Sequence, residues 1–114
     1  MKLASLLLAC ILTACESGPP ISPLIAAARQ GDTVSIAALI QSGADVNQRG
    51  GVNNWTPLMH AVHKNQAVSV RALIDAGADV NLAAGARGRD TALRLAEIDG
   101  NTEIVKLLRT HGAK

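Results

Sequence analysis

The sequence predicts an all-α solenoid of about three helix-turn-helix repeats, and two observations carry this prediction. A triplet that starts with Ser or Thr and ends with Leu recurs at residues 22–24, 56–58 and 91–93, after 34 and then 35 residues. A glycine follows 21 residues after the start of each triplet, at positions 43, 77 and 112. Self-similarity at a period of roughly 33 residues is typical of stacked helical pairs. Such stacks present binding surfaces rather than catalytic pockets.

The first helix of each repeat is predicted to begin at its triplet. Ser22, Thr56 and Thr91 are good N-cap residues, because their hydroxyls accept hydrogen bonds from amides of the first turn. Pro23 and Pro57 suit the first helical position, where no amide partner is needed. We therefore expect one short helix directly after each cap.

A second helix is predicted to follow each first helix after a tight turn. Gly31, Asn65 and Gly100 suit a left-handed residue between two short helices. The glycines at positions 43, 77 and 112 suit the end of the second helix in the same way. Apolar residues with helical spacing are expected to face the stack. In the first copy these residues are Val34, Ile36, Leu39 and Ile40.

The whole pattern resembles the ankyrin repeat, whose motif runs Thr-Pro-Leu-His through to Gly-Ala-Asp-Val-Asn. The sequence Gly-Ala-Asp-Val-Asn occurs at residues 43–47 and again at 77–81. The resemblance covers about residues 22–114. It implies an ankyrin-repeat solenoid with β-hairpin-like finger loops and repeats at about 22–54, 55–89 and 90–114.

Two departures from the motif affect the loops. The spacing inside the helical part is constant, so the extra length falls in the finger loops, at about residues 50–54 and 83–87. The motif histidine is replaced by Ile25, Met59 and Arg94. Its hydrogen bonds to the neighbouring loop are therefore expected to be absent.

Residues 1–14 are predicted to be a lipoprotein signal peptide. Lys2 precedes an apolar run from Leu3 to Leu12, which has the length of a signal-peptide core and is too short to span a bilayer. The following Leu-Thr-Ala-Cys at residues 12–15 resembles the lipobox of bacterial lipoproteins. The resemblance implies cleavage before Cys15 and attachment of lipid, including palmitate, to that cysteine.

The lipobox resemblance also implies a location. Residues 15–21 would form a lipidated tether, and Glu16 after the cysteine implies the outer membrane, facing the periplasm. Two alternatives stay open. One is a secretory signal cleaved elsewhere, which would leave Cys15 as a free thiol, and the other is a cytosolic start with a buried helix.

The composition after the signal peptide argues against several function classes. No cysteine follows Cys15, so a disulfide framework and a thiol nucleophile are excluded from the mature domain. Without Lys2 the chain has 10 Lys and Arg against 9 Asp and Glu, which is no nucleic-acid footprint. The sequence has no Gly-x-Ser-x-Gly, His-Glu-x-x-His, Ser-x-x-Lys or phosphate-loop motif. We expect a monomer that binds a protein partner and has no enzyme activity, cofactor or metal.

The resemblance places partner binding on the concave face, formed by the finger loops and the exposed side of the first helices. The candidate contact residues on this face are Arg29, Arg49, Trp55, His60, His63, Lys64, Arg87, Arg89, Asp90 and Asp99. Trp55 is the only aromatic residue. It is interpreted either as an interface hot spot or as a staple that packs over its own loop.

The two histidines and the basic loop each have two interpretations. His60 and His63 are three residues apart on one predicted helix and share one side. A metal site would need further ligands, and we expect exposed contact residues instead. Arg87 and Arg89 form a small basic loop that could meet lipid head groups or an acidic partner, or could simply be solvated.

These observations predict a lipid-anchored, periplasm-facing adaptor that binds a partner protein through its concave face. A narrower form of this role is an immunity protein against a periplasm-acting toxin. The alternative is an envelope stress or assembly factor that supports a periplasmic enzyme such as a catalase. An enzyme would need a polar pocket that the sequence does not supply.

Overall fold

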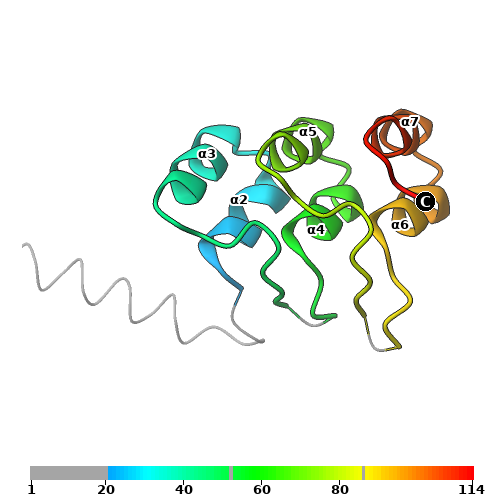
Figure 1. Cartoon of the computed structure of the whole chain (residues 1–114), viewed down its shortest axis with the longest axis horizontal. Helices are drawn as coiled ribbons and strands as arrows, with labels where there is room; N and C mark the ends of the chain where they lie inside the picture. Colours follow the sequence, from blue (N-terminus) through cyan, green and yellow to red (C-terminus); the bar gives the residue numbers. More distant parts are fainter. Residues whose placement is uncertain (1–20, 52, 86) are drawn as a thin grey trace, which may run out of the picture.

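The structure, a computed structural model, describes residues 21–51, 53–85 and 87–114. The predicted signal peptide, Cys15 and the tether up to residue 20 lie outside the described residues. Six helices are described, in three antiparallel pairs (Figure 1). The pairs are α2 (Pro23–Gln30) with α3 (Thr33–Gln41), α4 (Pro57–His63) with α5 (Ala67–Asp75), and α6 (Ala92–Asp99) with α7 (Thr102–Thr110).

The pairs stack side by side in two layers, an inner layer of α2, α4 and α6 and an outer layer of α3, α5 and α7 (Figure 1). This arrangement confirms the predicted all-α solenoid of three helix-turn-helix repeats. Among the described residues, no helix has the length and apolar character needed to cross a bilayer.

Each inner helix begins at the predicted N-cap. The hydroxyl of Ser22 accepts from the amide of Ile25 at 3.2 Å, and the hydroxyl of Thr56 accepts from that of Met59 at 3.3 Å. In the third repeat, Thr91 caps α6 without the help of a following proline. Local cap chemistry therefore sets where the inner helices start.

The predicted left-handed turns are also confirmed. Gly31, Asn65 and Gly100 have φ values of 75°, 61° and 72° between the inner and outer helices. The left-handed conformation costs conformational energy for a non-glycine residue, and asparagine is among the residues that tolerate it best. The turn reverses the chain so that each outer helix packs back on its inner helix.

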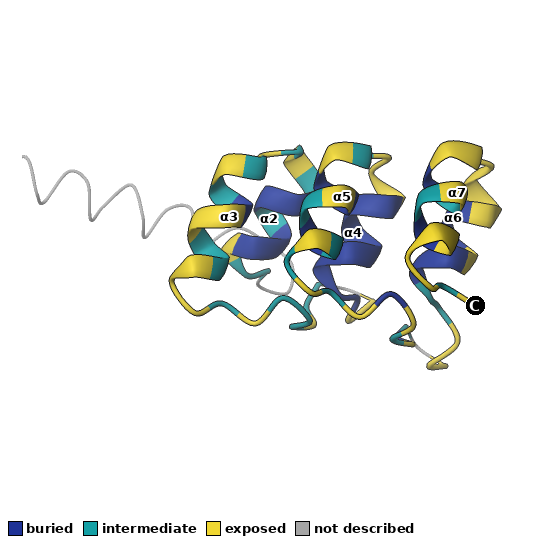
Figure 2. Cartoon of the chain, turned by 45° about the horizontal axis from the view of Figure 1, so that its top comes forward, coloured by how far each residue is buried: buried dark blue, intermediate teal, exposed yellow. Residues whose placement is uncertain are grey.

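The core lies between the two layers and between neighbouring repeats (Figure 2). Ile36 is 1% exposed, as predicted, but Val34 is 79% exposed and the prediction that it faces the stack is wrong. The two residues are about 200° apart around a helix with 3.6 residues per turn. Only one of them can face the core, and Leu39 and Ile40 lie half-buried at its edge.

The finger loops are short hairpin-like excursions that project from the same side of the stack (Figure 1). Antiparallel bridges close them, between Gly50 and Trp55 in the first finger and between Ala84 and Asp90 in the second. The Ala84 and Asp90 backbones exchange hydrogen bonds of 2.8 and 2.9 Å. Apart from these isolated bridges, the described residues form no β-strand.

The asparagine that ends each Gly-Ala-Asp-Val-Asn motif connects one repeat to the next. The side-chain oxygen of Asn47 accepts from the amide of Asp79 at 2.8 Å. In the same way, Asn81 accepts from the amide of Lys114 at 2.9 Å, and its NH₂ group donates to the carbonyl of Gly112 at 3.1 Å. These contacts join neighbouring repeats.

Candidate partner-binding surface

Trp55 lies beneath the candidate surface and connects the two fingers. Its side chain is 7% exposed, and its indole N–H donates to the carboxylate of Asp90 at 3.0 Å. The ring packs edge-to-face with His60 and His63, at centroid distances of 5.6 and 5.2 Å. Trp55 closes the first finger and Asp90 closes the second, so one side chain holds both finger bases in a fixed relation.

His60 holds the first finger against α4. Its ring is 8% exposed, and Nε2 lies 3.0 Å from the carbonyl oxygen of Gly50. A carbonyl only accepts, so Nε2 carries the hydrogen and donates. His60 therefore supplies a histidine bond to the loop from the position after Met59, a bond that the sequence motif did not predict.

The environment of His60 favours its neutral form. Burial lowers the pKa of the imidazole below its ordinary value of 6.5, and the bond to Gly50 opposes this shift. The nearby cations Arg29 and Lys64, together with His63, lower the pKa further. Arg29 at the end of α2 and Lys64 just after α4 therefore lie near His60 and the base of the first finger.

The structure divides the candidate residues into supporting and exposed groups. Trp55 and His60 are buried and Asp90 is half-buried, so these three shape the surface from beneath. At 7% and 8% exposed, Trp55 and His60 offer little surface to a partner. The staple interpretation of Trp55 fits better, with the difference that it reaches the next finger rather than only its own loop.

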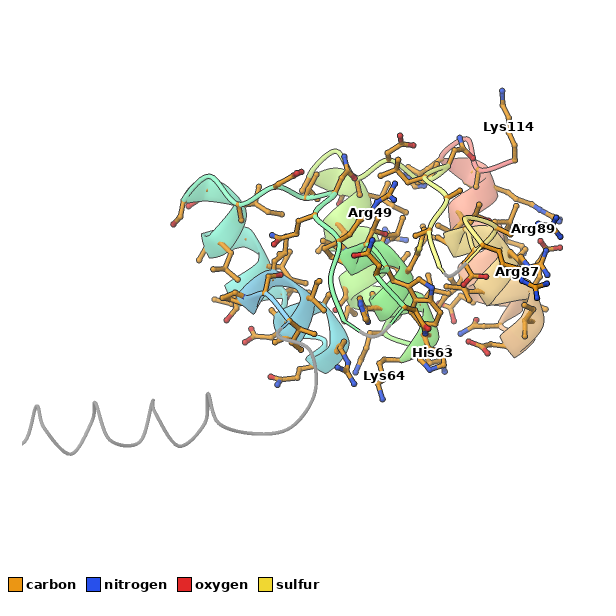
Figure 3. All side chains as sticks on the ribbon, turned by 90° about the horizontal axis from the view of Figure 1, so that it is seen from below. Arg49, His63, Lys64, Arg87, Arg89 and Lys114 are labelled. Atoms are coloured by element: carbon orange, nitrogen blue, oxygen red, sulfur yellow. The ribbon has the colours of Figure 1, made fainter. Side chains whose placement is uncertain are left out.

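The basic candidates that remain accessible lie at the inner helix ends and on the fingers. We call them the finger-side surface, and Figure 3 shows most of them from the finger side. In that view Arg87 and Arg89 lie together on the second finger, and His63 and Lys64 lie at the end of α4. The members of the finger-side surface are Arg29, which is half-buried, and the exposed Arg49, His63, Lys64, Arg87 and Arg89.

Equivalent positions in the three repeats place further residues beside this surface. Arg29, His63 and Ile98 occupy the same position in their inner helices, and Ile98 is 68% exposed. Asp99 is exposed at the position equivalent to Lys64. The inner edge is therefore basic in the first two repeats and becomes apolar and acidic in the third.

The surface offers positive charge and hydrogen-bond donors. Within the described residues, no group of three or more His, Cys, Asp or Glu side chains is placed to hold a metal ion. The two histidines of α4 both contact Trp55, and His60 is already bonded to a carbonyl. The arrangement can bind and orient an anionic or polar surface.

Comparisons with known proteins agree with this architecture. The family model described as "Ankyrin repeats (3 copies)" matches residues 3–84 and 24–114. The crystal structure of the human ASB11 ankyrin repeat domain is 33% identical over 82% of this chain, with a TM-score of 0.71. The match covers 41% of that domain, so this chain spans about two fifths of its length. No curated protein matches the chain.

Proposed function

Because this chain belongs to the ankyrin-repeat family, we propose that it is an adaptor that binds one partner protein through its finger-side surface. Ankyrin repeats are scaffolds for protein–protein interaction. The observation that carries the proposal is the Trp55–Asp90 hydrogen bond of 3.0 Å, which fixes the two fingers relative to each other. A pre-ordered surface loses less entropy on binding than two independent loops would.

We propose further that the adaptor is lipid-anchored through Cys15 and faces the periplasm from the outer membrane. The lipobox resemblance of residues 12–15 supports this. The tether would place the first finger close to the membrane, because Ile21 lies beside Gly51 and about six residues reach only about 20 Å. A partner would then be held near the membrane surface.

The anchor is tested by labelling growing cells with a palmitate analogue. The natural chain should carry the label and fractionate with the outer membrane, and Cys15→Ser should lose both properties. A label that persists in Cys15→Ser, or an unlabelled natural chain, would contradict the anchoring proposal. The partner experiment below does not depend on this outcome.

Partner binding is tested by chemical crosslinking in intact cells followed by purification of the chain. The test variant is His63→Ala with Lys64→Ala, because both side chains are exposed on the finger-side surface. The matched control is Arg71→Ala with Lys106→Ala on the outer helices, where both side chains are also exposed. One dominant partner that is lost only in the test variant is the expected result.

The identity of that partner separates the narrower roles. A secreted toxin, with survival lost only under attack by a neighbouring cell, would assign an immunity role. A periplasmic enzyme, with sensitivity to peroxide in the absence of any attacker, would assign a supporting role. No partner, or the same partner in all three samples, contradicts binding through this surface.

A further inference from the structure

We propose that the partner of the finger-side surface is a protein that presents an acidic patch. The inference rests on the proposed adaptor function and adds the chemistry of its partner. It comes from the distribution of charge over the folded chain. The nearly balanced net charge of the sequence conceals that distribution.

Positive charge is concentrated on one side of the stack. Five of the ten Lys and Arg residues among the described residues belong to the finger-side surface. Two acidic side chains, Asp90 and Asp99, lie beside this surface, and Asp90 is already bound to the indole of Trp55. Other acidic residues lie elsewhere, for example Asp75 at the end of outer helix α5 and Glu103 in outer helix α7. The bound partner therefore meets an excess of basic side chains.

The basic side chains are held at two levels. Arg49 lies beside the Gly50–Trp55 bridge at the base of the first finger, and Arg87 and Arg89 lie on the second finger (Figure 3). Arg29 and Lys64 lie at the ends of the inner helices α2 and α4. Burial is the main cause of the lowered pKa of His60, and the charges of Arg29 and Lys64 at these helix ends add to that shift. A flat membrane would meet the finger tips first, whereas a folded protein with relief can reach both levels.

An exposed apolar residue next to the finger-side surface also favours a protein as the partner. Ile98 is 68% exposed and continues the row formed by Arg29 and His63. Protein interfaces combine an apolar centre with a polar rim, and an exposed isoleucine beside basic side chains matches that composition. The competing occupant is an anionic membrane, because the proposed tether keeps the first finger near a bilayer.

The test compares two variants that remove the same number of charges. Arg49→Gln, Arg87→Gln and Arg89→Gln neutralise the fingers, and the matched variant neutralises the outer helices at Arg71, Lys106 and Arg109. Each processed protein is purified in detergent, its melting is checked by circular dichroism, and its affinity for labelled poly-L-glutamate is measured by fluorescence anisotropy. Poly-L-lysine of the same length is the probe of opposite charge.

The natural protein should bind poly-L-glutamate and not poly-L-lysine, and the affinity should fall as ionic strength rises. Loss of the three finger charges should weaken binding by about tenfold or more. The outer-helix variant should change it by less than about twofold. Equal weakening in both variants, or no binding of poly-L-glutamate by the natural protein, overturns the inference.

A second measurement addresses the membrane. Transfer of the protein to vesicles of phosphatidylcholine alone is compared with transfer to vesicles that also contain phosphatidylglycerol, so that any lipid anchor contributes equally to both. A preference for the anionic vesicles that the finger variant abolishes, without binding of poly-L-glutamate, overturns the inference in favour of a membrane. If crosslinking finds a partner through His63 and Lys64 while poly-L-glutamate fails to bind, the adaptor function stands and only the acidic patch is wrong.

Discussion

Trp55 stabilises the finger bases through both its ring and its indole N–H. The ring is buried against two histidines, and the N–H reaches the carboxylate of Asp90 in the next finger. A hydrogen bond to a charged acceptor is stronger than a neutral one, and losing one partner leaves the other unsatisfied. The pair therefore contributes to folding and to the shape of the surface together.

A double-mutant cycle tests this pair. Trp55→Phe keeps most of the ring packing but removes the N–H, and Asp90→Ala removes the acceptor. Each should lower the free energy of unfolding by about 1–3 kcal/mol, and the double variant should cost clearly less than their sum. Urea unfolding followed by circular dichroism measures all four proteins, and additive costs would show that the bond contributes nothing.

His60 makes stability depend on pH. Burial and nearby cations lower its pKa in the folded protein below 6.5, the ordinary value expected in the unfolded chain. The unfolded chain therefore binds more protons between the two values. This stabilising contribution is complete above about pH 6.5 and is lost as the pH falls from there through the lower folded pKa.

The comparison with His60→Gln isolates this contribution. Glutamine has an N–H group that can replace the bond to Gly50 but no titration in this range. The natural protein should lose more stability than the variant when the pH of urea unfolding is lowered from about 8 to about 5. Equal losses in the two proteins would contradict the assignment to His60.

The outer helices α3 and α7 begin with a side-chain cap, from Asp32 and Asn101, whereas α5 has none, and one polar group is left unpaired in its repeat. Asp32 caps α3 by accepting from the amide of Ser35 at 3.1 Å, and it also accepts from the Ser35 hydroxyl at 2.6 Å. In α5 the cap position is Gln66, which instead donates across to the carbonyl of Arg29 at 3.2 Å. The hydroxyl of Ser69, the equivalent of Ser35, is buried without a partner among the described residues.

Ser69→Ala should therefore stabilise the protein. It removes a buried hydroxyl whose loss of hydration is not offset by a hydrogen bond. A gain of about 1 kcal/mol in the free energy of unfolding is expected. Ser35→Ala is the matched control and should be neutral or slightly destabilising, since it removes an exposed bond. Both are measured by urea unfolding, and a clear destabilisation by Ser69→Ala would show that the hydroxyl has a partner.

Stacking of the repeats is reinforced over the whole molecule by the motif asparagines. Asn47 bonds the second repeat to the first, and Asn81 bonds the end of the third repeat to the second. In a solenoid each repeat depends on its neighbours, so the stability of the array is roughly a sum of repeat and interface contributions. In the described part of the chain, the third repeat contacts only the second, so it should be more sensitive than the second repeat, which is packed on both sides.

Asn81→Ala should loosen the third repeat before the others. It removes hydrogen bonds to Gly112 and Lys114, with an expected cost of about 1 kcal/mol for the pair because both are exposed. Hydrogen exchange should accelerate in α7 more than in α4. Asn53→Ala at the exposed tip of the first finger is the control, and equal acceleration throughout would contradict a local role.

Local patterns in the sequence were sufficient to predict the repeats, the N-caps at Ser22, Thr56 and Thr91, and the left-handed turn at Asn65. Each depends on interactions within a few residues, so residue type and spacing determine it. The apolar spacing was less decisive, because it identified Ile36 correctly but also assigned Val34 to the core. A period alone leaves the rotation of a helix against its neighbours open.

The features of the candidate surface depend on contacts between repeats, which only the tertiary structure could supply. Trp55 and Asp90 are 35 residues apart and meet because neighbouring fingers stack. The burial of His60 and the gathering of basic residues from several elements have the same origin. The sequence determined what each repeat would become, whereas the stacking of one repeat on the next determined which side chains are buried and which remain free to bind.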